Sequence, residues 1–146
     1  MPFERLSMDF VGPKPSVTPH KYKLVFVDEY SRFPFAFPCS DVSTSTVTKC
    51  LQQLFSIFGI PAYIHSDRGA QFMSAEVSSF LKSCGVAQSH TTRYNPRSNG
   101  QCERYNGTIW KAIQLTLKER NLPEKFWESV LPEVLHAVRS IFCTAT

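Results

Sequence analysis

The sequence contains no long apolar run. None of its hydrophobic stretches approaches the roughly 20 residues that a membrane-spanning helix needs. The opening segment, Met1 to Arg5, also lacks the basic and then apolar pattern of a secretory signal. We therefore expect a protein with no membrane partner, and the cytoplasm or the nucleus is its default location.

The cysteines are dispersed along the chain, and their number is odd. There is no C-x-x-C pair and no paired histidine motif, which argues against a disulfide framework and a structural zinc site. Buried free thiols are the simpler interpretation. The five cysteines are Cys39, Cys50, Cys84, Cys102 and Cys143.

The composition is that of one domain with a real core. The chain has 146 residues, of which 42% are hydrophobic, and its net charge is only +4. The segment from Thr91 to Lys125, however, contains seven basic and three acidic residues, so this segment alone carries +4. Such a local excess suits a polyanion, although an ordinary solvated helix face explains it about as well.

The first part of the chain predicts three strands. Leu6–Val11 alternates apolar and polar residues, Lys23–Asp28 is a short apolar run, and Phe33, Phe35 and Phe37 share one face of a third strand. Together they predict an antiparallel meander. Prolines 34 and 38 have no amide donors, which places the third strand at the sheet edge.

The remainder alternates helices and strands. We expect a capped helix over 47–58, a strand over 62–67, a helix capped by Ser74 and a strand over 86–91. A mobile loop over 94–101 and a long helix over 101–120 follow, and Pro123 suits the first turn of a last helical segment that Pro132 kinks or restarts. Helical crossovers make their flanking strands parallel and usually adjacent, so strand 62–67 should lie beside the first strand.

Three acidic residues lie at positions where α/β sheets commonly form ligand-binding or catalytic sites. Asp9 lies in the first strand and Asp67 at the end of its expected neighbour, where open α/β sheets usually bind ligands. Glu103 lies in the first turn of the long helix, where the helix dipole favours an anion. Carboxylates gathered in this way are hard ligands for Mg²⁺, and two ions about 3.5–4 Å apart can promote in-line displacement at phosphorus. Spacing alone supports this interpretation only weakly, because acids at strand ends are common.

The residues around these acids carry a more specific signal. Thirty-five residues (68–102) separate Asp67 from Glu103. With their neighbours, the acids closely resemble the three active-site segments of retroviral and gypsy-type LTR retrotransposon integrases, and 27–33 (VDEYSRF) is similar to the family's second strand and turn. The resemblance covers essentially the whole chain. The matching segments are Met8–Phe10 (MDF), His65–Phe72 (HSDRGAQF) and Asn99–Asn106 (NGQCERYN).

The resemblance implies an α/β RNase H-like fold, with a five-stranded mixed sheet (the antiparallel meander plus two parallel strands) flanked by helices. It implies a polynucleotidyl transferase that trims the 3′ ends of element DNA and joins them to target DNA. Asp9, Asp67 and Glu103 match the metal-binding catalytic acids, which would hold Mg²⁺ or Mn²⁺, two ions per site when DNA is bound. Double-stranded DNA, a homodimer or higher oligomer, and a nuclear location are also implied.

The resemblance suggests DNA contacts as well. Asn106, Trp110 and Lys111 share the helix side of Glu103 and resemble family residues that touch DNA near the active site. Lys111 would meet phosphate, whereas Trp110 would stack on a base or pack at a subunit interface. The full set of expected DNA-binding residues is Arg97, Gln101, Arg104, Asn106, Trp110 and Lys111.

Several alternatives stay open. The chain reads as one catalytic core domain over 1–146, with its last helix cut short and without the family's zinc-binding and DNA-binding flanking domains. A host protein descended from such an element, which binds DNA or protein, is a second hypothesis, and a ribonuclease H-like nuclease is a third. Asp28 is expected to cap a turn, and His65 is expected to pack, rather than to act in catalysis. The aromatic segment at Phe126 and Trp127 is compatible with a dimer surface.

Overall fold

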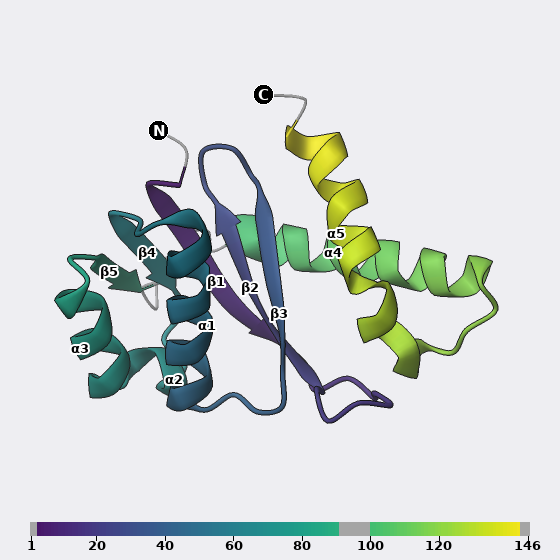
Figure 1. The fold of residues 1–146 in the computed structure, drawn as a ribbon, viewed down its shortest axis with the longest axis horizontal. Coiled ribbons are helices and arrows are strands. Elements are labelled where there is room, and N and C mark those ends of the chain that lie inside the picture. Colours follow the sequence, from purple (N-terminus) through teal and green to yellow (C-terminus); the bar gives the residue numbers. More distant parts are fainter. Residues whose placement is uncertain (1–2, 91–99, 144–146) are drawn as a thin grey trace.

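The computed structural model describes the backbone of residues 3–90 and 100–143, without the side chains of 100–103, 105 and 141–143. Figure 1 shows a sheet with helices on both of its sides. The strands are β1 (Arg5–Val11), β2 (Tyr22–Asp28), β3 (Pro34–Cys39), β4 (Tyr63–Ser66) and β5 (Ala87–His90). The helices are α1 (Thr44–Phe58), α2 (Ala70–Met73), α3 (Ala75–Ser83), α4 (Gly100–Glu119), the short 3₁₀ helix η2 (Glu124–Phe126) and α5 (Trp127–Cys143).

Within the described residues the strands form one five-stranded sheet in the order β3-β2-β1-β4-β5. The β1–β2 and β2–β3 pairs are antiparallel, whereas β1–β4 and β4–β5 are parallel. This confirms the predicted meander and the predicted place of β4 beside β1. The proline-containing β3 lies at an edge, as its missing amide donors require.

The two faces of the sheet pack against different helices. Leu6 and Met8 pack into the core that α1 and α3 cover, together with Leu51 and Val77. Val25 and Val27 of β2 point to the other face, where they pack against Ile109 and Ile113 of α4. In Figure 1, α1 crosses in front of the strands and α4 passes behind them. Since side chains alternate along a strand, the odd-numbered residues of β1 face α4.

The helix starts follow their predicted caps. The Ser43 and Ser74 side chains accept hydrogen bonds from the backbone amides of Thr46 and Val77, which begin α1 and α3. Pro132 lies inside α5, which runs through it as one element, so the predicted restart does not occur. Trp127 is 1% exposed and packs in the protein's own core, so it is not a surface residue of this chain.

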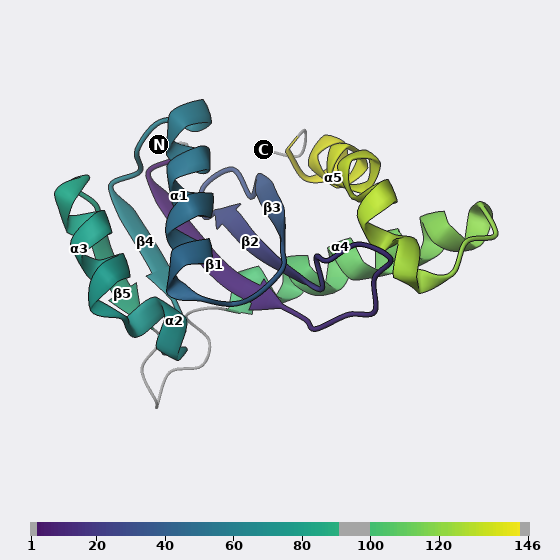
Figure 2. The same cartoon turned by 60° about the horizontal axis from the view of Figure 1, so that its bottom comes forward.

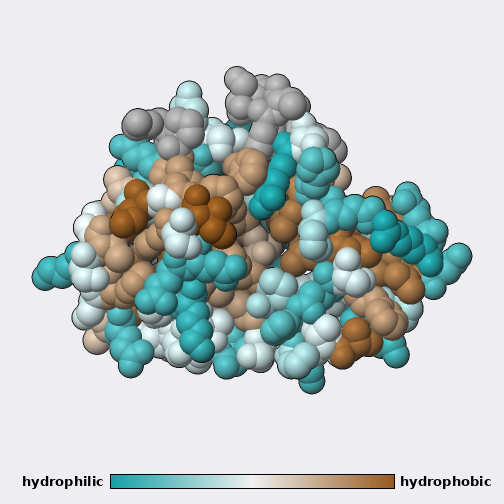
Figure 3. All heavy atoms as spheres, viewed as in Figure 1, coloured by the Kyte–Doolittle hydropathy of each residue, from teal (hydrophilic) through white to brown (hydrophobic). Residues whose placement is uncertain are grey.

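The surface carries one apolar feature of note. Ile57, Phe58 and Ile60, at the end of α1 and just beyond it, are exposed, and Figure 3 shows hydrophobic atoms gathered at that end of the helix. Among the described residues no helix combines the length and apolarity needed to span a membrane. Cys39 and Cys50 are buried free thiols, as expected, whereas Cys84 is a free thiol that is only half-buried.

Candidate active site

The parallel pairing of β1 with β4 brings two of the three predicted acids to the same level. The register pairs Arg5 with Tyr63 and Ser7 with His65. Continued by two residues, it sets Asp9 opposite Asp67. Both residues are half-buried, and strand alternation directs Asp9 toward the face that α4 covers. The sequence predicted this juxtaposition.

Helix α4 reaches the same place. The Asn106 side-chain Nδ2 lies 3.4 Å from Asp9 Oδ2, a long hydrogen bond in which the amide donates. Glu103 precedes Asn106 by three residues, close to one helical turn, and lies in the first turn of α4. The side chain of Glu103 lies outside the described part of the structure, so the third acid is placed by its backbone alone.

The turn after β4 holds the Asp67 carboxylate. The Gly69 backbone amide donates a hydrogen bond of 2.8 Å to Asp67 Oδ1. A Cβ at position 69 would lie 3.1 Å from that same oxygen and 2.8 Å from the Gln71 side-chain nitrogen. Glycine therefore leaves the carboxylate room to keep its position against the turn.

A second support for Asp67 comes from β5. His90 Nδ1 lies 3.0 Å from Ser66 Oγ and 3.2 Å from the Asp67 carbonyl oxygen, and Ser66 Oγ donates to that carbonyl at 3.0 Å. Two residues, Ser66 and His90, thus fix the backbone at the acid. The sequence analysis missed His90, because its role follows from the Ser66–His90 register of two parallel strands.

Asp28 and His65, which were not expected to act in catalysis, have the structural roles predicted for them. The Asp28 carboxylate accepts hydrogen bonds from the amides of Phe3, Tyr30 and Ser31 and from the Ser31 hydroxyl, so it organises a turn. His65 is buried, and its Nδ1 lies 2.6 Å from Ser89 Oγ. Burial lowers the pKa of His65; Glu29 opposes this shift and His90 adds to it. A neutral, packed imidazole follows.

The predicted DNA contacts divide into three groups. Arg104 and Lys111 are exposed on α4, as DNA contacts must be. Trp110 is half-buried, and Lys14 Nζ lies 4.1 Å from the centre of its ring, so the protein itself occupies a face of the indole that base stacking would need. Arg97, the loop residues 94–99 and the side chain of Gln101 lie outside the described residues.

A metal site can be tested only in part. Among the described side chains, which exclude Glu103, no cluster of three or more histidine, cysteine, aspartate or glutamate residues could hold a metal ion. The donors that are described fit a hard cation, because Asp9 and Asp67 supply carboxylate oxygens. Beside them, Asn106 Oδ1 is a buried oxygen that lacks a hydrogen-bond partner, which is a costly state without a compensating ligand.

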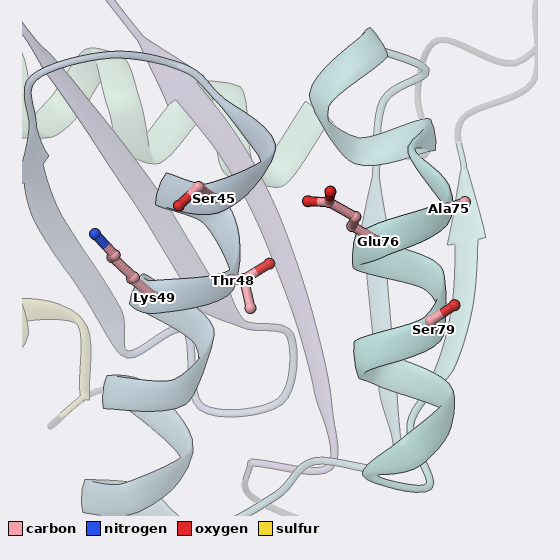
Figure 4. A pocket seen from close by; sticks show the side chains of 6 residues that line it. All are labelled: Ser45, Thr48, Lys49, Ala75, Glu76 and Ser79. Atoms are coloured by element: carbon pink, nitrogen blue, oxygen red, sulfur yellow. The ribbon is translucent and has the colours of Figure 1, made fainter.

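A separate hollow is unrelated to these acids. It opens between α1 and α3, has a volume of about 530 Å³, and lies on the face of the sheet opposite α4. Figure 4 shows it lined by short polar side chains together with Lys49 and Glu76. No carboxylate pair converges there among the residues that line it, so we do not regard it as a catalytic site.

Comparison with known proteins agrees with the fold and the motifs. Residues 1–96 match the family described as the integrase core domain. The chain is 36% identical over 141 residues to the Pro-Pol polyprotein of simian foamy virus type 3, and 36% identical over 135 residues to the Pol polyprotein of Radiation murine leukemia virus. These matches cover 97% and 91% of the chain, but only 12% and 23% of the polyproteins.

Solved structures show the same architecture. An integrase chain of the simian T-cell lymphotropic virus intasome, in complex with PP2A regulatory subunit B56 gamma, superposes with a TM-score of 0.79 at 25% identity, covering 92% of this chain and 48% of that one. The HTLV-2 integrase catalytic core domain in complex with magnesium gives a TM-score of 0.73 at 23% identity, covering 92% of this chain and 84% of that one. The fold is therefore the RNase H-like fold of retroviral integrase catalytic cores. The chain belongs to the integrase core domain family, and its homologues lie in retroviral and foamy viral Pol polyproteins.

Proposed function

We propose that this chain is the catalytic core of a metal-dependent polynucleotidyl transferase, which trims the 3′ ends of element DNA and joins them to target DNA. The observation that carries the proposal is the register of β1 with β4. It pairs Ser7 with His65, two residues before Asp9 and Asp67, and Asp9 contacts Asn106 of α4, the helix whose first turn contains Glu103. We assign the three acids as catalytic and metal-binding residues.

Each described residue has a distinct part in this proposal. Asp9 and Asp67, with Glu103, would hold Mg²⁺ or Mn²⁺, two ions once DNA is bound. Asn106 orients Asp9 through its side-chain amide, while Gly69 and His90 fix the carboxylate and the backbone of Asp67. Bound divalent cations supply charge at the phosphate and acidify the attacking water or hydroxyl. Without them, the gathered carboxylates would repel one another.

Partners follow from the same proposal. The HTLV-2 core is described in complex with magnesium, in dimeric and trimeric forms, and we extend metal binding and oligomerisation to this chain. Its exposed Ile57, Phe58 and Ile60 are consistent with a protein-covered surface. Double-stranded DNA would contact α4 and the segment before it, through Arg97, Gln101, Arg104, Asn106 and Lys111. Lys111 would act as a point charge for phosphate.

The wider setting is also inferred. From the motifs at 8–10, 65–72 and 99–106, we infer that the chain resembles gypsy-type LTR retrotransposon integrases most. Residues 1–146 would then form the core domain of a longer protein that has a zinc-binding domain before it and a DNA-binding domain after it. Joining element DNA to chromosomes would require it to enter the nucleus.

A branched DNA that mimics an integration product tests the function directly. With Mg²⁺ or Mn²⁺, we expect the wild type to transfer strands, and we expect Asp67→Asn and Glu103→Gln to be inactive. Glu76→Gln is the matched control, because Glu76 is an exposed acid on α3 and loses the same charge. Mg²⁺ should also raise the melting temperature of the wild type and of Glu76→Gln, but not that of Asp67→Asn.

Other results in the same assay would support the nuclease or the host-derived binding module instead. Cleavage of an RNA/DNA hybrid without strand transfer would make the chain a ribonuclease H-like nuclease. DNA or protein binding with no chemistry in either metal would make it a host-derived binding module. Equal strand transfer by the wild type and Asp67→Asn would remove the assigned acids from the mechanism.

A further inference from the structure

Three lysines gather around Trp110, next to the proposed active site. Lys14, Lys21 and Lys23 line one narrow hollow together with Trp110. The backbone amide of Lys14 donates a 2.7 Å hydrogen bond to the carbonyl of Lys21. This bond closes the loop between β1 and β2 and holds the two lysines side by side.

Among the described residues, no acidic side chain forms an ion pair with these lysines. Lys14 Nζ and Lys23 Nζ lie 4.1 Å and 5.5 Å from the centre of the Trp110 ring. Lys23 is 2% exposed, and its Nζ lacks a hydrogen-bond partner. The ion pairs found among the described residues join other side chains, His20 to Glu128 and Arg120 to Glu133. An aromatic face attracts cations but does not neutralise them.

The effect of this arrangement is greatest on the pKa of Lys23. Its pKa is lowered from 10.5 to about 8, first because the ammonium is buried and second because Lys14 lies nearby. The group still carries most of its charge at neutral pH. A buried, unpaired cation beside a second cation is a costly state in the free protein, and an anion at this place would relieve it.

The lysines lie on the same face of the sheet as Asp9. Asp9 pairs with Val25 and Val11 pairs with Lys23, so the two rungs are two residues apart along β1, a distance of roughly 6.6 Å. Helix α4 repeats this spacing, because Asn106 contacts Asp9 and Trp110 contacts Lys23 one turn later. The lysines therefore lie close enough to Asp9 to contact the same DNA strand as the proposed active site.

We propose that Lys14 and Lys21, with Lys23 beneath them and Trp110 as their platform, bind a backbone phosphate of DNA beside the active site. This inference rests on the proposed function and names a contact that holds the DNA strand in place. The hollow is narrow, so the phosphate sits at its mouth on Lys14 and Lys21, while the buried ammonium of Lys23 adds attraction from below. Trp110 then holds Lys14 and does not stack on a base. Contacts of this kind position DNA without reading its sequence.

The salt dependence of DNA binding tests the site. Binding of a fluorescent duplex is measured by anisotropy without divalent metal, over a series of salt concentrations. Lys14→Gln and Lys21→Gln should each reduce the slope of log affinity against log salt, and the double variant should reduce it by about one, on any duplex sequence. Lys23→Met should weaken binding several-fold. Lys49→Gln is the matched control, because Lys49 is exposed on α1, on the opposite face of the sheet.

The result that overturns the proposal is a slope for Lys14→Gln and Lys21→Gln that equals the slope for Lys49→Gln. Both residues lie in a loop outside the core, so they decide the matter even if Lys23→Met fails to fold. If Lys14→Gln and Lys21→Gln lost binding to an oligoglutamate peptide while their DNA binding was unchanged, the site would bind an acidic protein. That result would also overturn the proposal. Strand transfer by the wild type is scored separately. If it is absent while the slopes change, the proposed function fails and the phosphate site stands.

Discussion

Replacing the buried lysine of β2 with methionine, Lys23→Met, should stabilise the protein. Methionine keeps much of the length of the lysine stem and is adaptable in packing, but it brings no charge into the space beside Trp110 and Trp127. The wild type, by contrast, buries an ammonium whose Nζ has no hydrogen-bond partner. Removing that group removes its desolvation penalty and its repulsion by Lys14.

The size of the effect follows from the pKa. A decrease from 10.5 in the unfolded chain to about 8 in the folded one corresponds to about 3 kcal/mol. Between these two values the unfolded chain binds a proton that the folded chain lacks, so the stability of the wild type rises with pH across this window. Below pH 8 the full penalty is present. At pH 10 it should have fallen to about 1 kcal/mol.

Urea unfolding at pH 7 and at pH 10 measures this change. The midpoint of Lys23→Met should exceed that of the wild type at pH 7, with an unchanged m-value, and most of the difference should disappear at pH 10. Lys49→Met, which replaces an exposed lysine of α1, should show no such pH-dependent difference. A variant less stable than the wild type at pH 7, or a difference that is the same at both pH values, would refute the description of Lys23 as a strained buried cation.

The remaining predictions concern Asp67 and one helix cap. Gly69→Ala places a Cβ 3.1 Å from Asp67 Oδ1; the strand-transfer rate should fall on the order of tenfold with little change in melting temperature, and an unchanged rate would contradict the assigned role. His90→Ala frees the Asp67 backbone and should raise the Mg²⁺ concentration needed for half-maximal rate, whereas a lower rate with the same Mg²⁺ requirement would mean only a general structural role. Ser74→Ala removes the cap of α3 and should cost about 1 kcal/mol in urea unfolding, so a loss near zero would show that the cap is not needed.

Much of the fold was predictable because its signals are local. Period-two alternation marked β1, and the two prolines of β3 marked an edge strand, which the sheet order confirms. The rule that a helical crossover joins adjacent parallel strands placed β4 beside β1, and with it Asp67 beside Asp9. Asp28 was correctly expected to bind amides of its own turn, since that interaction spans only a few residues.

Features that depend on packing were not predictable in the same way. Lys23 stands at the start of an apolar run, where a lysine is ordinarily solvated, and it is buried beside Trp110 of α4 and Trp127 of α5. His90 gains its role from a strand pairing whose register the sequence does not state. Trp110 was expected to meet a base or another subunit, whereas Lys14 from a distant loop occupies its ring. Pro132 was expected to kink or restart the last helix, and α5 runs through it as one element, so the restart does not occur.

Helix α4 connects the proposed catalytic acids with the lysines around Trp110. One turn of it contacts Asp9 through Asn106, and the next contacts the lysines through Trp110. The spacing between acids and lysines is therefore set by the rise of a single helix, whose buried Ile109 and Ile113 anchor it to the sheet. Because Glu103 lies in the first turn of this same helix, a shift of α4 would move the third acid and the platform for Lys14 together. Catalysis and DNA positioning should then fail together when α4 is displaced, but separately when Asp67 or Lys14 alone is replaced.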